Sequence, residues 1–338
     1  MKDNIKFIDL FCGIGGFHQA FSSLGAKCVF ACDYDKHARE TYKINYGIEP
    51  HGDIREVNPH DISDFDVLCA GFPCQPFSLA GVSKKNSLGM KHGFEDEEQG
   101  NLFFEILRII QVKRPKIMFL ENVKNLKSHD RKNTWRVIEN SLISNGYYVF
   151  HKIVDAASYV PQHRERIFIV CFDKSVFPYI DFEFPKEPIK RITELKDIIE
   201  KQVENKYTLS DKLWQYLQKH KENSAKKGNG FGFGLVDLEK DMITRTMSAR
   251  YYKDGSEILI KQENNNPRRL TPKEARKLFG YPSDFVINVS DCQAYKQFGN
   301  TVVVPAIKHT AEQILQTVAE YQNGGARIQF IQESLWVV

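Results

Sequence analysis

Hydrophobic and polar positions along the first half of the chain show two patterns, short apolar runs of strand length and stretches with the periodicity of an amphipathic helix. Short apolar runs of strand length predict β-strands at residues 6–11, 27–31, 67–70, 116–121, 147–153 and 166–172. Amphipathic stretches between them predict helices at residues 16–23, 36–46, 102–112 and 134–145. Strands that alternate with helices are typical of βαβ units. We therefore expect an α/β fold with a doubly wound, mostly parallel sheet.

The alternation stops near residue 175 and returns close to the C-terminal end. The intervening segment is rich in Lys, Glu, Asn and Gly. Thr271 is a natural N-cap and the proline after it suits the first helical position, so a helix should begin there, and a second helix should follow Pro305. The parts that we expect are a catalytic and cofactor-binding domain (1–174), a smaller irregular domain (175–265) and a segment whose C-terminal helix returns to the first domain (266–338).

Composition narrows the class of protein. No run approaches the roughly 18 apolar residues of a membrane span, and the first residues do not resemble a signal peptide. Seven cysteines without a CxxC pair argue against a disulfide framework or a zinc site. We expect a cytoplasmic protein without a bound metal. The net charge of +4 permits a nucleic-acid partner but does not indicate one.

Cys74 is the most distinctive candidate for chemistry. It directly follows Pro73, just beyond the apolar run 66–70, and open α/β sheets bind ligands outside the carboxyl ends of their strands. Proline fixes its own φ and biases the preceding residue away from helix, so this turn is stiff. Most free cysteines are small buried hydrophobic residues, and the position alone leaves both interpretations open.

Glycines and acids stand where the first strands end. Gly13, Gly15 and Gly16 follow the first strand, where glycines let a ligand approach the backbone and the helix N–H groups. Asp33 lies at the end of the second strand, where nucleotide-binding sheets use an acid to bind ribose hydroxyls. Asp53 offers a carboxylate suited to an exocyclic amine. Singly, each acid is more often a solvated loop residue; together they predict an adenosine-containing cofactor.

Six motifs, in order along nearly the whole chain, resemble those of the DNA (cytosine-5)-methyltransferase family, and in particular its bacterial restriction–modification methylases. The motifs are FIDLFCGIGGF (7–17), GFPCQPFS (71–78), FLENV (119–123), QHRERI (162–167), RRLTP with GYP (268–272 and 280–282) and QFGNTV (297–302). The resemblance implies the fold of S-adenosylmethionine-dependent methyltransferases. It also implies site-specific methyl transfer to C5 of a cytosine in double-stranded DNA.

The same resemblance implies S-adenosyl-L-methionine as the cofactor, with Phe11 against the adenine, Asp33 on the ribose and Asp53 on the adenine amine. Cys12 stands where the family often has Ala or Ser, and Asp33 stands where Glu is more usual, a shorter side chain that would loosen the ribose contact. The residues assigned to the cofactor are Phe11, Cys12, Gly13, Ile14, Gly15, Gly16, Phe17, Asp33, Tyr34, Asp53, Ile54, Gly71, Pro73, Leu102, Asn300, Thr301 and Val302.

Methylation at C5 needs a nucleophile, because C5 of cytosine reacts poorly until a thiolate adds to C6. The resemblance assigns this role to Cys74, whose thiol, with an ordinary pKa of about 8.5, needs a positive environment. Arg164 would supply charge and hydrogen bonds to the base, and Arg166 would support the site. Glu121 would donate a proton towards N3, which a pKa raised by desolvation would favour, and Asn122 would hold its surroundings. The alternatives are a structural hydrogen bond for the acid and a surface ion pair for the arginines.

A stacked base cannot reach such a thiol, so the enzyme must flip it out of the duplex. The glycine-bearing loop 79–99 is suited to close over DNA, and the alternative is an ordinary solvent loop. Segment 175–265 corresponds to the target recognition domain of the family. Its stretches 226–234 and 244–260 are similar to segments of methylases that act on GC-rich sites, such as GGNNCC-like or CCWGG-like targets. The DNA contacts that we expect are Gln75, Ser78, Ser83, Lys84, Lys85, Arg245, Thr246, Arg250 and Lys253.

Other hypotheses remain open from the sequence. A tRNA-modifying branch shares these motifs, but the Cys-Phe-Thr segment usual in that branch is not found. A catalytically silent DNA-binding relative would have no chemical need for all of Cys74, Glu121, Arg164 and Arg166. A nicotinamide oxidoreductase would require a fuller GxGxxG. We expect a monomer that serves a restriction–modification system, with a cognate endonuclease but no stable complex with it, and with no membrane partner.

Overall fold

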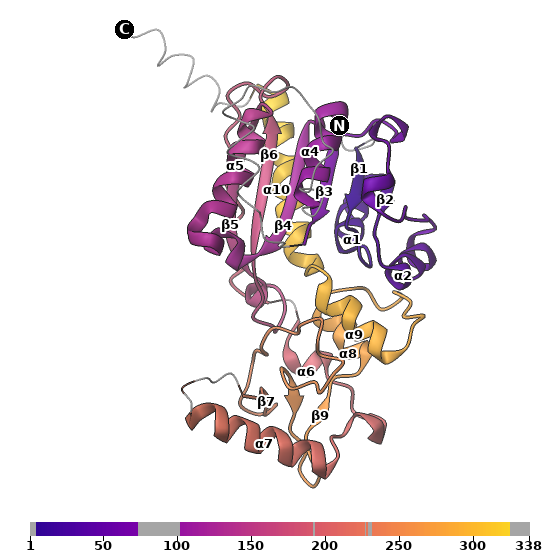
Figure 1. Ribbon diagram of the computed structural model, residues 1–338, viewed down its shortest axis with the longest axis vertical. Coiled ribbons are helices and arrows are strands. Elements are labelled where there is room, and N and C mark those ends of the chain that lie inside the picture. Colours follow the sequence, from indigo (N-terminus) through magenta and orange to yellow (C-terminus); the bar gives the residue numbers. More distant parts are fainter. Residues whose placement is uncertain (1–4, 74–101, 192, 227, 229–231, 325–338) are drawn as a thin grey trace.

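A six-stranded sheet forms the larger part of the computed structural model, which describes residues 5–73, 102–191, 193–226, 228 and 232–324 (Figure 1). Its strand order is β2-β1-β3-β4-β6-β5. The strands are β1 (Lys6–Leu10), β2 (Lys27–Cys32), β3 (Val67–Gly71), β4 (Ile117–Val123), β5 (Tyr147–Asp155) and β6 (Glu165–Asp173). Five of them point in one direction, and β6 runs antiparallel to both its neighbours. The expected α/β fold with a mostly parallel sheet is confirmed.

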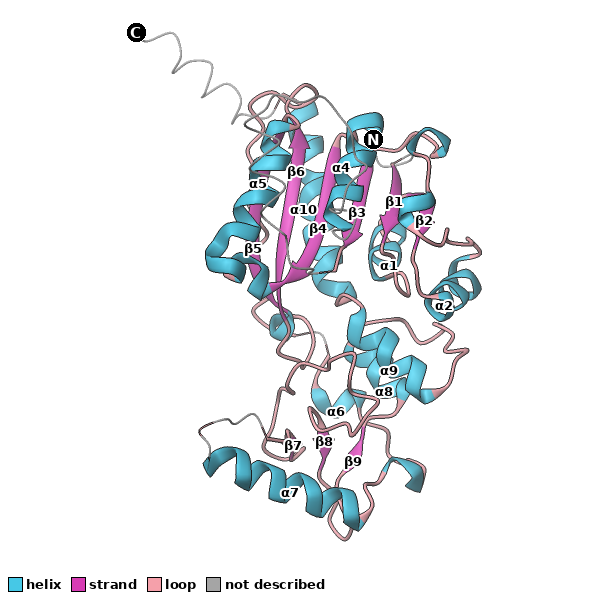
Figure 2. Ribbon diagram, in the orientation of Figure 1, coloured by secondary structure: helices cyan, strands magenta, loops and turns pink. Residues whose placement is uncertain are grey.

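Helices cover both faces of this sheet (Figure 2). Alternate strand residues point to opposite faces, so Phe7 and Phe119 pack in one hydrophobic cluster with α1 and α10, while Ile8 and Leu120 pack in another with α4 and α5. The helices are α1 (Gly16–Ser22), α2 (Lys36–Tyr46), α4 (Leu102–Lys113), α5 (Asn133–Ser144) and α10 (Val304–Gln322). Short 3₁₀ turns link them: η1 (Ile54–Glu56), η2 (Pro59–Asp61), η3 (Lys124–Lys127), η4 (His129–Lys132) and η5 (Ala156–Ser158).

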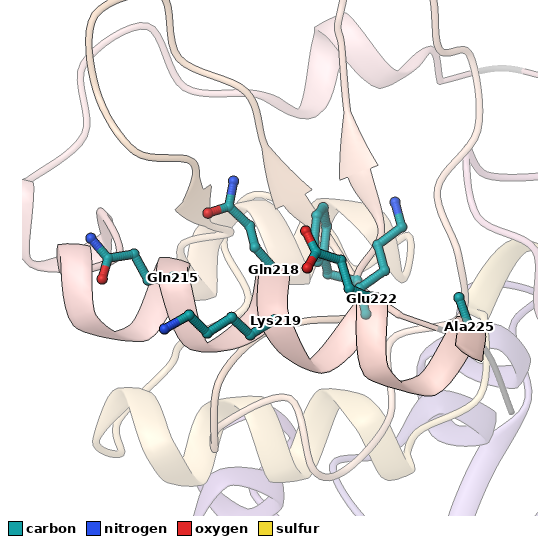
Figure 3. Close-up of a pocket in the computed structure, with 7 residues that line it drawn as sticks. Gln215, Gln218, Lys219, Glu222 and Ala225 are labelled. Carbon is teal, nitrogen blue, oxygen red and sulfur yellow. The ribbon is translucent and has the colours of Figure 1, made fainter. Parts of the chain in front are cut away.

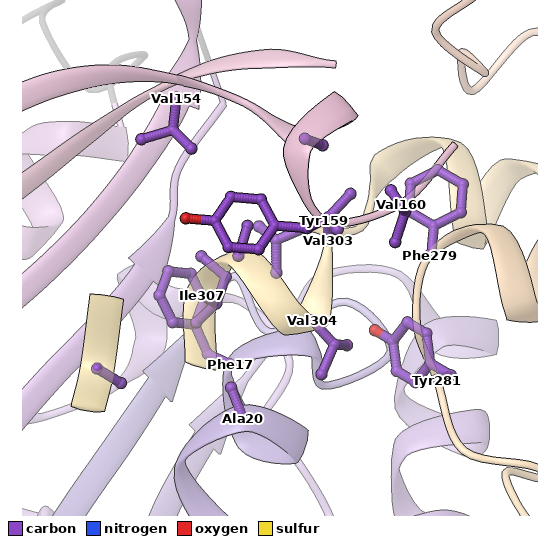
Figure 4. Packing of buried hydrophobic residues seen from close by; sticks show 14 of the residues in the cluster. Phe17, Ala20, Val154, Tyr159, Val160, Phe279, Tyr281, Val303, Val304 and Ile307 are labelled. Carbon is purple, nitrogen blue, oxygen red and sulfur yellow. The ribbon is translucent and has the colours of Figure 1, made fainter. Parts of the chain in front are cut away.

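Helix α10 brings the C-terminal segment back to the start of the chain. Proline lies in its first turn, as expected, and the helix packs along α1. Phe17 and Ala20 of α1 share a buried cluster with Val304 and Ile307 of α10 (Figure 4). Segments at opposite ends of the sequence therefore form one core beneath the first strand.

The smaller part lies beyond the carboxyl ends of the parallel strands (Figure 2). It has a three-stranded sheet of order β7-β8-β9, in which β7 and β8 are parallel and β9 is antiparallel to β8. Its elements are α6 (Leu195–Ile198), η6 (Asn205–Tyr207), α7 (Asp211–Lys226), β7 (Leu235–Val236), β8 (Leu259–Ile260), β9 (Arg268–Arg269), α8 (Pro272–Leu278) and α9 (Asp291–Asn300). Thr271 caps α8 by accepting a hydrogen bond from the Glu274 backbone N–H, which confirms the expected helix start. No helix in the described ranges is long and apolar enough to span a membrane.

Candidate active site

The ends of β3 and β4 bring two of the motifs together. Gly71 pairs with Glu121 in the parallel ladder, and a Cβ built on Gly71 would lie 3.7 Å from Oε2 of Glu121. The Asn122 side-chain amide donates to the carbonyl oxygen of Phe72 at 2.8 Å, which ties the chain leaving β3 to the end of β4. Pro73 follows and is exposed. The next predicted residues lie outside the described ranges: Cys74, Gln75, Ser78, Ser83, Lys84 and Lys85.

Glu121 is buried beside a basic side chain of the antiparallel strand. Nε of Arg166 lies 3.0 Å from Oε1 of Glu121, because β6 runs alongside β4 and places Arg166 opposite Val123. Burial raises the pKa of Glu121, and the charges of Arg166 and Arg164 oppose that rise. The net direction is upward, so this carboxyl group keeps its proton to a higher pH than an ordinary glutamic acid.

Arg164 lies just before β6 and is only 3% exposed. Its guanidinium donates to three backbone carbonyls, those of Met247 (3.0 Å), Gly299 (2.9 Å) and Thr301 (2.9 Å). It also lies over the ring of Phe279, with 5.1 Å between Cζ and the ring centroid. Burial lowers the pKa of Arg164 to about 9. The side chain thus links the start of β6 to two distant segments. One is the stretch around Met247 in the smaller part, and the other is the end of α9 with its connection to α10.

The two arginines of the QHRERI motif therefore have different surroundings. The terminal nitrogens of Arg164 are bound to backbone carbonyls, and the contact with Glu121 is made by Arg166. From the sequence, Arg164 is expected next to the base and Arg166 in a supporting position. The geometry places Arg166 against the acid and Arg164 behind it.

The loop between β1 and α1 has a left-handed backbone at three positions. Phe11, Gly13 and Gly15 have φ values of 54°, 52° and 82°, which glycine adopts without strain. The Gly13 N–H donates to Oδ2 of Asp33 at 2.7 Å. A Cβ built on Gly13 would meet no atom within 4 Å, whereas on Gly15 it would lie 2.2 Å from the ring of Tyr46. The loop is thus packed against Tyr46 at Gly15 and has open space beside Gly13.

The segment after α9 packs directly on this loop. A Cβ on Gly16 would lie 2.4 Å from Cγ2 of Val302 and 3.1 Å from Oγ1 of Thr301. The Thr301 hydroxyl is hydrogen-bonded to that of Tyr281 at 2.6 Å. Asn300, the last residue of α9, is exposed. The structure therefore brings together two predicted cofactor segments that lie far apart in the sequence. Of the other predicted loop residues, Cys12, Ile14 and Phe17 are buried in the core.

The carboxylate of Asp33 already has two backbone partners. It accepts hydrogen bonds from the N–H groups of Gly13 (2.7 Å) and Asp35 (2.8 Å). Burial raises the pKa of Asp33, and these hydrogen bonds oppose the rise. Tyr34 follows with its ring 77% exposed. An acid fixed by the loop thus stands next to an exposed aromatic ring.

Asp53 forms an ion pair with Arg55, two residues further along the chain. Nε of Arg55 lies 2.9 Å from Oδ1 and 3.0 Å from Oδ2 of Asp53, and Nη2 also donates to Oδ2. This contact lowers the pKa of Asp53. Ile54 is buried, and its carbonyl accepts a hydrogen bond from Arg108 at 2.8 Å. Leu102, at the start of α4, is half-buried.

Two residues that the sequence did not single out support protein groups predicted to bind the cofactor. Tyr46 donates its hydroxyl to the carbonyl of Gly15 at 3.0 Å, and Arg55 holds the carboxylate of Asp53. A signal for Tyr46 was present, since it stands one turn after Tyr42 on an amphipathic helix and faces the same way. Arg55 stands two residues from its acid and had no comparable signal.

The segment of the smaller part that carries the predicted DNA-contacting residues packs against the connection between β5 and β6. The backbone N–H of Thr244 donates to the Pro161 carbonyl at 2.9 Å, and the Thr246 hydroxyl donates to the carbonyl of His163. A Cβ on Gly299 would lie 2.4 Å from the backbone of Ser248, so α9 also packs against this segment. The basic residues predicted to contact DNA are exposed: Arg245, Arg250 and Lys253.

A surface hollow elsewhere in the described structure does not adjoin these residues. It runs along α7, has a volume of about 640 Å³, and is lined by Gln218, Lys219 and Glu222 among others (Figure 3). Nζ of Lys221 lies 4.6 Å from the centroid of the Phe233 ring there. Within the described residues, no group of three or more His, Cys, Asp and Glu side chains is placed to hold a metal ion.

Comparison with known proteins gives consistent results. The profile of the family described as C-5 cytosine-specific DNA methylase matches residues 5–316. The Type II methyltransferase M1.ScrFI of Lactococcus lactis subsp. cremoris is 50% identical over 319 residues, which cover 93% of this chain and 78% of that protein. The DNA-cytosine methyltransferase of Escherichia coli (strain K12) is 43% identical over 377 residues, covering 94% and 80% respectively.

Solved structures show a likeness of fold. The Entamoeba histolytica methyltransferase EhMeth matches with a TM-score of 0.73 and 20% sequence identity, over 94% of this chain and 99% of that chain. A mutant of Spodoptera frugiperda DNMT2 matches with a TM-score of 0.71, also at 20% identity, over 92% and 99%. The likeness supports the expected fold, that of S-adenosylmethionine-dependent methyltransferases.

Proposed function

The chain belongs to the family of C-5 cytosine-specific DNA methylases, and from that membership we propose that it transfers a methyl group from S-adenosyl-L-methionine to C5 of a flipped-out cytosine in double-stranded DNA. The match covers residues 5–316, and relatives of the DNA (cytosine-5-)-methyltransferase class are up to half identical. The observation that carries the proposal is the meeting of Glu121, Arg166 and the chain leading to Cys74 at one edge of the sheet.

The residues around the β1–α1 loop fit this cofactor. Open space adjoins Gly13, where backbone N–H groups and a carboxylate can bind a nucleoside. Asp33 has lone pairs left for the ribose hydroxyls after its two backbone contacts. The exposed ring of Tyr34 offers a surface for the adenine. When bound, the cofactor would supply an electrophilic methyl group on sulfur.

The chemistry that we propose for the chain begins at Cys74. Its thiolate adds to C6 of the cytosine, so an S–C6 bond forms and the ring electrons move towards C5 and N3. Glu121 donates a proton at N3 as negative charge develops there, and its raised pKa favours the protonated donor. After C5 has gained the methyl group it loses its proton to a base. The C5–C6 double bond then re-forms, Cys74 leaves as thiolate, and N3 returns its proton to the Glu121 carboxylate.

The neighbouring side chains position these groups. Arg166 holds the Glu121 carboxyl group and supplies positive charge where the base enters. Asn122 fixes the carbonyl of Phe72, two residues before Cys74, and thereby sets the direction of the turn. We assign Arg164 a supporting role, because its guanidinium donors bind backbone carbonyls.

We also propose the wider setting in which the enzyme acts. Residues 175–265 would recognise the target sequence, and Arg245, Thr246, Arg250 and Lys253 would contact DNA phosphates or guanine edges. We propose that the enzyme acts as a monomer in the cytoplasm. It would serve as the modification enzyme of a restriction–modification system, as the Type II names of its relatives suggest, without a stable complex with an endonuclease.

Transfer of a labelled methyl group tests the proposal. The protein is incubated with S-adenosyl-L-methionine carrying a labelled methyl group and with either unmethylated duplex DNA or unmodified tRNA. We expect label in the DNA alone, at cytosine C5 after hydrolysis of the product. Label in tRNA alone would transfer the activity to RNA. Label in neither, with the protein folded and bound to the cofactor, would contradict the proposal.

A further inference from the structure

A short basic segment follows β4 and belongs to none of the groups discussed so far. It comprises Lys124, Lys127, Arg131, Lys132 and Arg136, all exposed. Residues 124–136 contain these five basic side chains and one acid, Asp130, a formal charge of +4, which equals the net charge of the whole chain. The rest of the chain is therefore neutral on balance. We call residues 124–136 the basic segment.

The basic segment is attached to the edge of the sheet that carries the proposed active site. It begins three residues after Glu121, directly after the last residue of β4. Nζ of Lys124 lies 2.8 and 2.7 Å from the two carboxylate oxygens of Glu165, and Glu165 stands between Arg164 and Arg166. In Figure 1 these turns connect the lower end of β4 to α5. The segment therefore extends from the site along one side of it.

The segment proposed to recognise DNA is also attached to the residues just before β6. Thr244 and Thr246 bind the backbone of Pro161 and His163, only a few residues before Glu165. Two sets of exposed basic side chains, one on 124–136 and one on 245–253, are thus anchored to residues 161–166. A linear polyanion lying across the site would meet both sets.

The backbone of the basic segment is held in an unusual conformation. Asp130, Arg131 and Lys132 have φ values of 46°, 52° and 73°, in a region that costs non-glycine residues roughly 1–2 kcal/mol each. Leu126 and Trp135 anchor the two ends in the core. Backbone strain of this kind persists only where surrounding contacts impose it, and such positions cluster at functional sites.

We infer that the basic segment binds the phosphates of duplex DNA beside the flipped cytosine, an inference that rests on the function proposed above. Its exposed basic side chains lie on two successive turns, Lys124–Lys127 and His129–Lys132, and on the first part of α5. Phosphate contacts of this kind position the duplex and do not read its sequence.

The test compares two double variants with the same change in charge. Lys127→Gln/Lys132→Gln neutralises two residues of the basic segment. Lys6→Gln/Lys27→Gln neutralises two exposed residues at the amino ends of β1 and β2, on the opposite edge of the sheet. Binding of a duplex that the wild type methylates, and of a duplex that it does not methylate, is measured by fluorescence anisotropy between 50 and 300 mM KCl.

Each lost phosphate contact lowers the slope of log K against log [salt] by about 0.9. We expect Lys127→Gln/Lys132→Gln to lower the slope by up to about 1.8 on both duplexes, and Lys6→Gln/Lys27→Gln to leave it unchanged. Cofactor affinity should stay at the wild-type value in both variants, which checks folding. Equal slopes for both variants and the wild type, with methylation intact, would overturn the inference while leaving the proposed function standing. A wild type that neither binds nor methylates DNA would instead overturn the function on which it rests.

Discussion

Glu121 lies in an environment that acts on its pKa in two directions. Burial at the end of β4 raises the pKa, and the charges of Arg166 and Arg164 oppose it. The carboxyl group is buried, and a compensating cation, Arg166, lies 3.0 Å from it. This combination is what a general acid needs when it must donate a proton and then tolerate the charge that remains.

Glu121→Gln removes this proton while keeping the size of the side chain and its ability to hydrogen-bond. We expect the single-turnover rate of methyl transfer to fall by about two orders of magnitude or more. Cofactor and DNA affinities, measured by equilibrium binding, should change little and serve as the control. A rate close to that of the wild type would exclude Glu121 as the donor.

The dependence of the rate on pH should report the same residue. In the mechanism proposed above, the active form has Glu121 protonated and Cys74 ionised. Because the pKa of Glu121 is raised, the protonated donor persists above the ordinary range of a glutamic acid and is lost as pH rises through that raised pKa. The thiolate fraction rises with pH instead. We expect a bell-shaped profile of single-turnover rate, with the alkaline fall missing in Glu121→Gln. An unchanged alkaline fall in that variant would assign it to another group.

Substitutions of the two arginines should have different effects on the free energy of unfolding and on the methyl-transfer rate. Arg164→Met leaves three buried carbonyls without their donor, at about 1–3 kcal/mol each, so the free energy of unfolding should fall by about 3 kcal/mol or more. Arg166→Met should lose less stability, because Glu121 can then take up a proton, yet it should lose most of its methyl-transfer rate. Denaturant unfolding and single-turnover rates distinguish them, and the reverse pattern would contradict our assignment.

At the scale of elements, the β1–α1 loop and the segment after α9 are bound through a contact that only glycine permits. A Cβ in Gly16→Ala would lie 2.4 Å from Val302, and overpacking of this kind costs about 1–3 kcal/mol. We expect the dissociation constant for S-adenosylmethionine to rise about tenfold or more, since 1.4 kcal/mol is a factor of ten. Isothermal titration calorimetry measures it.

Gly47→Ala is the matched control for this change. Gly47 has φ +69° and no atom within 4 Å of a built Cβ. Alanine there should cost about 1–2 kcal/mol of stability through its left-handed backbone and leave cofactor affinity unchanged. Equal losses of cofactor affinity in both variants would show that the Gly16 contact has no specific role.

Strongly periodic elements could be predicted from the sequence. The helix expected at 36–46 forms as α2 over Lys36–Tyr46, and all six strands lie within two residues of their predicted ends. Helix α7 was missed because it buries only Leu217 fully, so its apolar stripe is too narrow to stand out. The antiparallel direction of β6 was not predicted either, although the short β5–β6 link, without a crossover helix, carried that signal.

The site was less predictable than the fold, because its contacts join distant segments. Arg164 and Arg166 are two residues apart, and strand alternation would place both on one face. The structure separates them because β6 begins only at Glu165, which leaves Arg164 outside the ladder. The packing of Thr301 and Val302 on Gly16 likewise depends on how α9 and α10 dock, which no local pattern in the sequence records.

At the scale of the whole molecule, the parallel strands end where the smaller part begins (Figure 2). The guanidinium of Arg164 and the hydrogen bonds of Thr244 and Thr246 to the backbone of Pro161 and His163 hold these two parts together. The proposed acid, the cofactor loop, the proposed recognition segment and the end of β3 that leads to Cys74 therefore lie along one edge. This arrangement would let a single chain bind the proposed cofactor on one side and a duplex across the other.

The most direct test of cytosine methylation is bisulfite sequencing of unmethylated plasmid DNA after incubation with S-adenosylmethionine and either the wild type or Cys74→Ala. We predict protected cytosines within one recurring short sequence for the wild type and none for Cys74→Ala, which should still bind DNA. Protection that persists in Cys74→Ala would contradict the thiolate mechanism. Absence of protection with a folded, cofactor-bound wild type would contradict DNA cytosine-5 methylation itself.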